Sequence, residues 1–223
     1  VVAVGEEEVE VPAERVLVAT GRLPNTDELG LELTPVRLDD GGRVIVGPDR
    51  RAARGILAIG DITAGPALAH KATAEAEVAA LTVAGRPATF APLAVPEVVF
   101  CDPEVASAGM SVAAAEAELG AARSFRFPLA ASARARTLGA ATGQAEVVAD
   151  GDGTVVGVHL AGPGVAELAG EAALAVEMGA SLEDLALTIH PHPTVSEALA
   201  EAAHGALGTP LHVSAAKRRS GKD

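Results

Sequence analysis

The sequence Asp150-Gly-Asp-Gly153, between two valine-containing runs, constrains the fold more than any other segment of this chain. Asp-Gly pairs favour the tight turns that join antiparallel strands, because glycine adopts positive φ angles without a steric penalty. The flanking runs, residues 144–149 and 154–161, have the length and the apolar content of strands. The segment therefore predicts a β-hairpin.

Further strands and helices are expected around this hairpin and predict an α+β unit. Ser111 can cap a helix, because its side-chain oxygen can accept from a free N–H group of the first turn. Ser181-Leu-Glu-Asp184 has a capping-box pattern and predicts another helix start. The expected strands are 97–100, 102–109 and 124–130, and the expected helices are 112–119, 165–178, a short one after Ser181, and 198–207. With four Phe and no Trp or Tyr, the core must consist mainly of small aliphatic side chains.

The N-terminal part of the chain predicts a separate set of elements. They are a hairpin at 1–19 with strand runs at 1–4, 9–11 and 16–19, two further strands at 43–46 and 56–59, and a helix at 66–84. Gly21 and Pro24 should end the strand run at 16–19. Pro66 suits the first turn of the helix. The chain begins with Val1 in what reads as the middle of a strand, without an initiator Met, so we expect that it is truncated at its N-terminus.

A strand, a Gly-Asp turn and a helix start follow one another over residues 56–70. The Asp61 carboxylate could accept from a sugar-like hydroxyl there, and the free N–H groups of the helix start could stabilise negative charge on a ligand. The local pattern alone favours an ordinary structural reading. Gly-Asp pairs are common, His70 fits a helix surface, and Gly21 fits a plain exit from a strand.

The segment His190-Pro-His-Pro-Thr-Val-Ser-Glu197 places an imidazole five residues before a carboxylate, on a bend that two prolines restrict. A carboxylate that accepts from one nitrogen of His192 would fix the tautomer and free the other nitrogen to take a proton. The same letters also fit a capping box in which Glu197 caps Thr194. The local pattern alone favours capping and leaves the general-base pair open.

Composition and charge exclude several classes of function. A net charge of −13 argues against nucleic-acid binding, which needs clustered Lys and Arg. The only such cluster, Lys217-Arg-Arg219, lies in what we expect to be a frayed tail. With no apolar run near ~20 residues and no signal peptide, we expect a soluble, cytoplasmic protein without membrane contact.

Metal and thiol chemistry are not expected either. A zinc site from His190, His192 and His204 is disfavoured, because no cysteine lies nearby and prolines restrict the turn. Cys101 is the only cysteine, so no internal disulfide can form. Without a basic neighbour to lower its pKa, we expect it to be an unreactive packing residue.

Three segments together resemble the class I pyridine nucleotide-disulfide oxidoreductases. They are A-T-G-R-x-P-N from residue 19, I-G-D-x-x-x-G-P-x-L-A-H-K-A from residue 59, and H-x-H-P-T-x-x-E from residue 190. His190 favours the dihydrolipoamide dehydrogenase branch, because the glutathione-reductase branch typically lacks a histidine there. A glutathione-reductase-like enzyme, a soluble transhydrogenase, or an inactive isolated dimerisation fragment remain alternatives.

The resemblance implies cofactors, partners and roles for particular residues. His192 would be the general acid/base that Glu197 orients, and FAD and NAD would be the cofactors. A homodimer would share each active site between subunits, and the lipoyl-bearing acyltransferase of a 2-oxoacid dehydrogenase complex is a possible partner. The implied cofactor-binding residues are Asp61 at the ribityl chain, Ala67, Leu68, Ala69 and His70 beside the isoalloxazine ring, and Gly21 near the nicotinamide cofactor.

The implied fold class is α/β and α+β, with the end of an NAD/FAD-binding Rossmann-like region followed by an α+β dimerisation domain. The expected segments are the end of the NAD-binding domain at 1–25, an FAD-binding central segment at 26–90, a dimerisation domain at 91–213 and a disordered tail at 214–223. The resemblance also implies two G-x-G-x-x-G fingerprints for FAD and NAD and a redox disulfide C-x-x-x-x-C, all in an N-terminal half that we expect to be missing, and this chain contains neither pattern. By itself it should therefore not catalyse the oxidation of a dihydrolipoyl dithiol by NAD that a full-length parent would perform.

Overall fold

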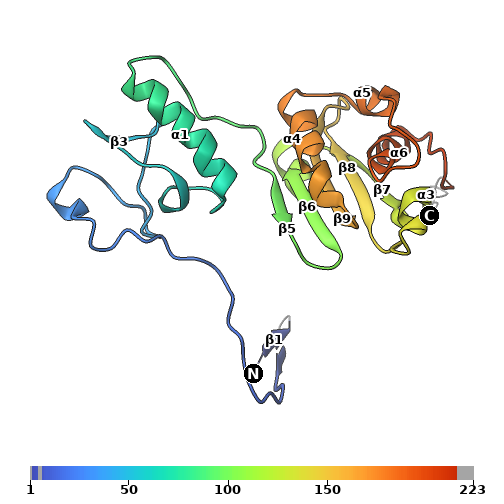
Figure 1. Ribbon diagram of the computed structural model, residues 1–223, viewed down its shortest axis with the longest axis horizontal. Helices are drawn as coiled ribbons and strands as arrows, with labels where there is room; N and C mark the ends of the chain where they lie inside the picture. Colours follow the sequence, from blue (N-terminus) through green and yellow to red (C-terminus); the bar gives the residue numbers. More distant parts are fainter. Residues whose placement is uncertain (1, 5–6, 215–223) are drawn as a thin grey trace. The chain divides into compact units, whose positions relative to one another are not determined.

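The computed structural model describes residues 2–4 and 7–214 (Figure 1). It divides into two compact units, Val1–Phe90 and Ala91–Asp223. The expected disordered tail lies outside the described residues except for Ser214, and so does the basic cluster at 217–219. Among the described residues, no helix combines the length and the apolar character that crossing a membrane requires.

The C-terminal unit is built on a five-stranded antiparallel sheet with the order β5-β6-β9-β8-β7. The strands are β5 (Glu97–Val99), β6 (Glu104–Gly109), β7 (Arg123–Pro128), β8 (Gln144–Ala149) and β9 (Val155–Gly162). The predicted hairpin is confirmed and joins β8 to β9. Its turn is closed by Asp150, whose Oδ1 accepts from the N–H groups of Asp152 and Thr154 at 2.9 Å.

The described part of this unit, up to Ser214, has five α-helices: α2 (Val112–Leu119), α3 (Ala133–Thr137), α4 (Ala169–Glu177), α5 (Leu182–Leu187) and α6 (Glu197–Ala206). Two predicted helix starts are confirmed. Ser111 accepts from the N–H of Ala114, and Ser181 forms a full capping box with Asp184. The segment predicted as one helix at 165–178 instead begins with the 3₁₀ turn η4 (Val165–Leu168), and α3 was not predicted.

Helices α4 and α6 pack on the sheet and form the core with it (Figure 1). Their core side chains are mostly alanine, as the composition requires: Ala172, Ala175 and Val176 from α4, and Ala198, Leu199, Ala202 and Ala203 from α6. Gly205 allows α6 to lie close to β7, because a Cβ there would be 2.1 Å from Cδ1 of Phe125. This close contact fixes the position of α6 on the sheet.

The N-terminal unit contains the hairpin of β1 (Val2–Val4) and β2 (Glu7–Val9), the short pair β3 (Arg51–Ala53) and β4 (Ile56–Leu57), and the helix α1 (Ala69–Val83). Two 3₁₀ turns, η1 (Leu31–Leu33) and η2 (Gly60–Ile62), complete it. The helix begins at Ala69, so Pro66 lies before it and not in its first turn as predicted. It ends before Gly85, whose φ is 71°.

Three predictions about local structure were wrong. Residues 16–19 form no strand, since no described segment pairs with their backbone, and Leu17 is 91% exposed. Residues 43–46 form no strand either, because only Val44 makes isolated bridges there. Cys101 is exposed rather than packed, because the loop between β5 and β6 carries it to the surface.

Candidate functional site

A histidine and a glutamate meet at the start of α6, as one of the two readings of that segment predicted. Nδ1 of His192 lies 2.8 Å from Oε1 of Glu197, the first residue of the helix. With a carboxylate as acceptor, Nδ1 carries the hydrogen and donates it. Nε2 is then available to take a proton, and the His192 side chain is 70% exposed.

The capping reading holds in part. Oε2 of Glu197 accepts from the backbone N–H of Thr194 at 2.8 Å. The reciprocal bond of a capping box is not made, because the helix begins at Glu197 with Ser196 as its N-cap, so Thr194 lies outside the first turn. Oγ1 of Thr194 donates instead to the carbonyl of Pro191 at 2.7 Å. One carboxylate therefore fixes both the imidazole and the backbone that follows it, so the two readings do not exclude each other.

His190 attaches the same loop to α4. Its Nε2 lies 2.8 Å from Oε1 of Glu171 and its Nδ1 lies 2.9 Å from the carbonyl of Thr188. The His190 side chain is only 6% exposed, in contrast to that of His192. The first histidine of the motif is thus held by two acceptors, while the second presents its free nitrogen to the solvent.

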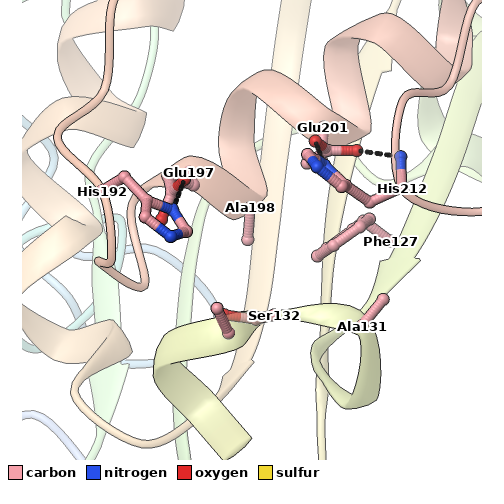
Figure 2. Close-up of a pocket in the computed structure, with 9 residues that line it drawn as sticks. Phe127, Ala131, Ser132, His192, Glu197, Ala198, Glu201 and His212 are labelled. Atoms are coloured by element: carbon pink, nitrogen blue, oxygen red, sulfur yellow. Dashed lines mark hydrogen bonds and ion pairs between the residues drawn. The ribbon is translucent and has the colours of Figure 1, made fainter. Parts of the chain in front are cut away.

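His192 and Glu197 line a small pocket whose opposite wall is formed by Phe127 of β7 and the segment around Ser132 (Figure 2). A second pair lies in the same pocket. Nδ1 of His212 is 2.5 Å from Oε1 of Glu201, and the backbone N–H of His212 donates to Oε2 of Glu201 at 3.3 Å. The site is therefore made of two imidazole–carboxylate pairs.

The charges of the two pairs act on each other. Burial acts to raise the pKa of the Glu197 carboxyl, but the Thr194 N–H and the nearby imidazoles of His192 and His212 outweigh it and lower that pKa. The hydrogen bond that the His212 ring donates to Glu201 and the negative charge of Glu201, with help from the charge of Glu197, raise the pKa of His212. The two pKa shifts favour the charged forms, which are the Glu197 carboxylate and the His212 imidazolium.

In the N-terminal unit, the segments with predicted cofactor residues come together at the start of α1. Nη1 of Arg22 donates to the carbonyl of Ala67 at 3.0 Å, which joins the Gly21 segment to the residues 67–70. Gly21 has a φ of 72°, and a Cβ there would meet no atom within 4 Å. Leu68 and Ala69 form the junction of loop and helix, whose first turn has no side-chain cap.

Asp61 is exposed on the turn η2, and a buried network holds that turn. Glu75 is fully buried and accepts from the N–H of Gly60 and from Arg50 Nη1, while Nζ of Lys71 lies 3.2 Å from its Oε1. Nζ of Lys71 also donates to the carbonyl of Gly60 at 3.0 Å. An exposed carboxylate on a fixed turn, beside an uncapped helix start, fits the hydroxyl and anionic groups of a flavin nucleotide.

Sequence reasoning missed three contributors to these sites. Arg22 and the Glu201–His212 pair join residues far apart in the chain, and no local pattern predicts such contacts. The pair Lys71 and Glu75 had a usable signal, because two opposite charges stand four residues apart on one face of the predicted helix. Among the described residues, no three His, Cys, Asp or Glu are grouped to hold a metal ion.

Comparison with known proteins gives matches over most of the chain. Residues 95–203 match the model "Pyridine nucleotide-disulphide oxidoreductase, dimerisation domain", and residues 1–76 match "Pyridine nucleotide-disulphide oxidoreductase". The chain is 45% identical over 205 residues to a dihydrolipoyl dehydrogenase of Geobacillus stearothermophilus, with 91% of this chain and 44% of that protein covered.

Two further relatives agree. A dihydrolipoyl dehydrogenase of Halobacterium salinarum is 47% identical over 208 residues, covering 92% of this chain and 44% of its own length. The crystal structure of LpdA from Mycobacterium tuberculosis aligns with a TM-score of 0.76 and 31% identity, over 83% of this chain and 41% of that one. The chain thus spans less than half the length of these relatives.

Proposed function

The chain belongs to the pyridine nucleotide-disulphide oxidoreductase family, and we propose that it forms the C-terminal part of a dihydrolipoyl dehydrogenase. The observation that carries the proposal is the 2.8 Å contact between Nδ1 of His192 and Oε1 of Glu197. It leaves Nε2 of an exposed imidazole ready to act as a base. Identities of 45% and 47% to dihydrolipoyl dehydrogenases support the choice of substrate class.

In the proposed reaction, Nε2 of His192 accepts the proton of a dihydrolipoyl thiol. The thiolate is the nucleophile in thiol–disulfide exchange, so this transfer activates the substrate. It would attack a redox disulfide elsewhere in the full-length protein and release one of its sulfurs as a thiolate, since this chain has only Cys101. Glu197 holds the ring through Nδ1 and stabilises the imidazolium that forms. When Nε2 of His192 gives the proton up again, the hydrogen bond between Nδ1 and Glu197 keeps the ring in place for the next cycle.

FAD and NAD are the cofactors that we propose for the full-length protein. Bound FAD would supply a two-electron carrier between dithiol and NAD. Asp61 would accept from the ribityl chain, and the backbone of residues 67–70 would lie beside the flavin ring. Gly21 would let the chain pass close to the nicotinamide cofactor, because a side chain is missing there.

We further propose a homodimer with each active site shared between subunits, and a cytoplasmic location. The match of residues 95–203 to a dimerisation domain supports the dimer. The lipoyl-bearing acyltransferase of a 2-oxoacid dehydrogenase complex is the proposed protein partner, since it would carry the dihydrolipoyl group. Sedimentation of the chain tests the dimer directly, and a monomer at micromolar concentration would count against it.

A substrate comparison on the full-length protein tests the proposed reaction. We expect NAD-dependent oxidation of dihydrolipoamide with a bound-flavin absorption band, and no NADPH-dependent reduction of glutathione disulfide. Activity on glutathione disulfide alone would assign the protein to the glutathione-reductase branch. Hydride exchange between NADH and NADP without dithiol turnover would assign it to the transhydrogenases.

A further inference from the structure

The second histidine–glutamate pair stands one helical turn after the first. Glu197 and Glu201 lie four residues apart on α6, and both line the pocket (Figure 2). His192 reaches Glu197 from the loop before the helix, and His212 reaches Glu201 from the segment after it. The two ends of α6 therefore each return an imidazole to the same side of the helix.

Two carboxylates at this spacing repel each other, and burial makes the repulsion stronger. The Glu201 residue is only 6% exposed, so its charge needs a cation beside it. Among the described residues, the ionisable groups that line the pocket are the two glutamates and the two histidines. The residues that line the facing wall are uncharged: Phe127 of β7, Ala131 of η3 (Leu129–Ala131), Ser132, and Ala133 of α3. The arginines of these elements, Arg123 and Arg126 of β7 and Arg134 and Arg136 of α3, do not line the pocket.

We propose that His212, held by Glu201, is a positioning residue whose positive charge faces Glu197 and sets the pH range in which the His192–Glu197 pair takes up a proton. This inference rests on the proposed function of His192 as the base. His212 has no contact with the substrate in this role. It acts on Glu197, and Glu197 acts on His192.

The direction of the effect follows from the charges. A cation makes every neighbouring group harder to protonate, and its removal makes them easier to protonate. The pKa of Glu197 is lowered in part by the charge of His212, and the pKa of His212 is raised in part by that of Glu197. Loss of the charge at position 212 should therefore move proton uptake by the base pair to higher pH.

The test follows the imidazole rings of the 223-residue chain by NMR while the pH is varied. In His212→Gln we expect the protonation midpoint of the His192 ring to rise by about 0.2–0.7 pH unit, the scale of partly exposed ion pairs. His212→Lys keeps the charge and should restore the wild-type midpoint. His204→Gln is the matched control, because His204 lies on the same helix outside the pocket and contacts Thr209.

An unchanged His192 midpoint in His212→Gln, with the chain folded, would overturn the inference. An equal shift in the Gln and Lys variants would also overturn it, since the charge would then not be the cause. The measurement needs no turnover, so its failure is distinct from failure of the proposed reaction. In the full-length enzyme, His212→Gln should move the acidic limb of the kcat/KM profile to higher pH by the same amount, and His204→Gln should leave it in place.

Discussion

Glu197 binds His192 and the backbone N–H of Thr194 with its two oxygens, both at 2.8 Å. The orientation of the proposed base and the geometry of the helix start therefore depend on one carboxylate. Any change at Glu197 should affect catalysis and local stability together, which separates it from changes at His192.

Glu197→Gln should lower turnover of the full-length enzyme by roughly 10- to 100-fold, because the neutral amide no longer stabilises an imidazolium. Its NH₂ group would also face the N–H of either His192 or Thr194, so one hydrogen bond is lost. Steady-state kinetics and thermal unfolding of the same variant measure both effects. Unchanged kcat would show that the carboxylate only caps the helix.

Asp184→Asn should remove part of the pH dependence of stability. The backbone N–H and hydroxyl of Ser181 lower the pKa of the Asp184 carboxyl below its ordinary value of 3.8. A lowered folded-state pKa stabilises the fold at pH values above 3.8 and loses that effect as the pH falls through the folded value. The Tm of the variant should thus lie below wild type at pH 7 and approach it as the pH falls below the ordinary value of 3.8. A constant Tm difference across this range would contradict the assignment.

Gly205→Ala should destabilise the C-terminal unit by about 1–3 kcal/mol, the usual cost of overpacking. The added Cβ would lie 2.1 Å from Cδ1 of Phe125, so α6 or the ring must move. Gly170→Ala in α4 is the control, because a Cβ there meets nothing within 4 Å. That variant should gain roughly 0.5–1 kcal/mol from helix propensity. Chemical denaturation measures the free energy of unfolding of both variants. A change of the same sign in the two variants would contradict the close packing of α6.

Glu75→Gln should destabilise the N-terminal unit by about 3 kcal/mol, because Lys71 and Arg50 are left near a neutral group in a buried place. Glu77→Gln, an exposed change on the same helix, should stay within about 0.5 kcal/mol of wild type. Urea unfolding measures the difference. In the full-length protein, loss of flavin in Glu75→Gln but not in Glu77→Gln would show that the network supports the turn that carries Asp61.

The parts of the fold that sequence could predict are those with local causes. The turn at Asp150 and the caps at Ser111 and Ser181 use side chains within four residues, and all three are confirmed. The expected fold class and family are confirmed as well, by the matches over residues 1–76 and 95–203. Local hydrogen-bonding chemistry and distinctive motifs sufficed for these conclusions.

Predictions failed where a distant partner decides the structure. Residues 16–19 have the composition of a strand but no described segment to pair with, and a strand needs such a neighbour. His212 lies 11 residues after Glu201, in a segment without a recognisable pattern, so its place in the pocket followed only from the structure. The sequence alone did not decide whether Glu197 contacts His192, because the same residues fit both a helix cap and an oriented base.

The most direct test of the central claim is the turnover of His192→Gln in the full-length enzyme, with His204→Gln as the matched control. The account predicts that kcat for dihydrolipoamide oxidation falls by at least ~100-fold in His192→Gln while the flavin absorption spectrum is unchanged, and that the control keeps wild-type turnover. Near-normal kcat in His192→Gln would contradict the assignment of His192 as the base.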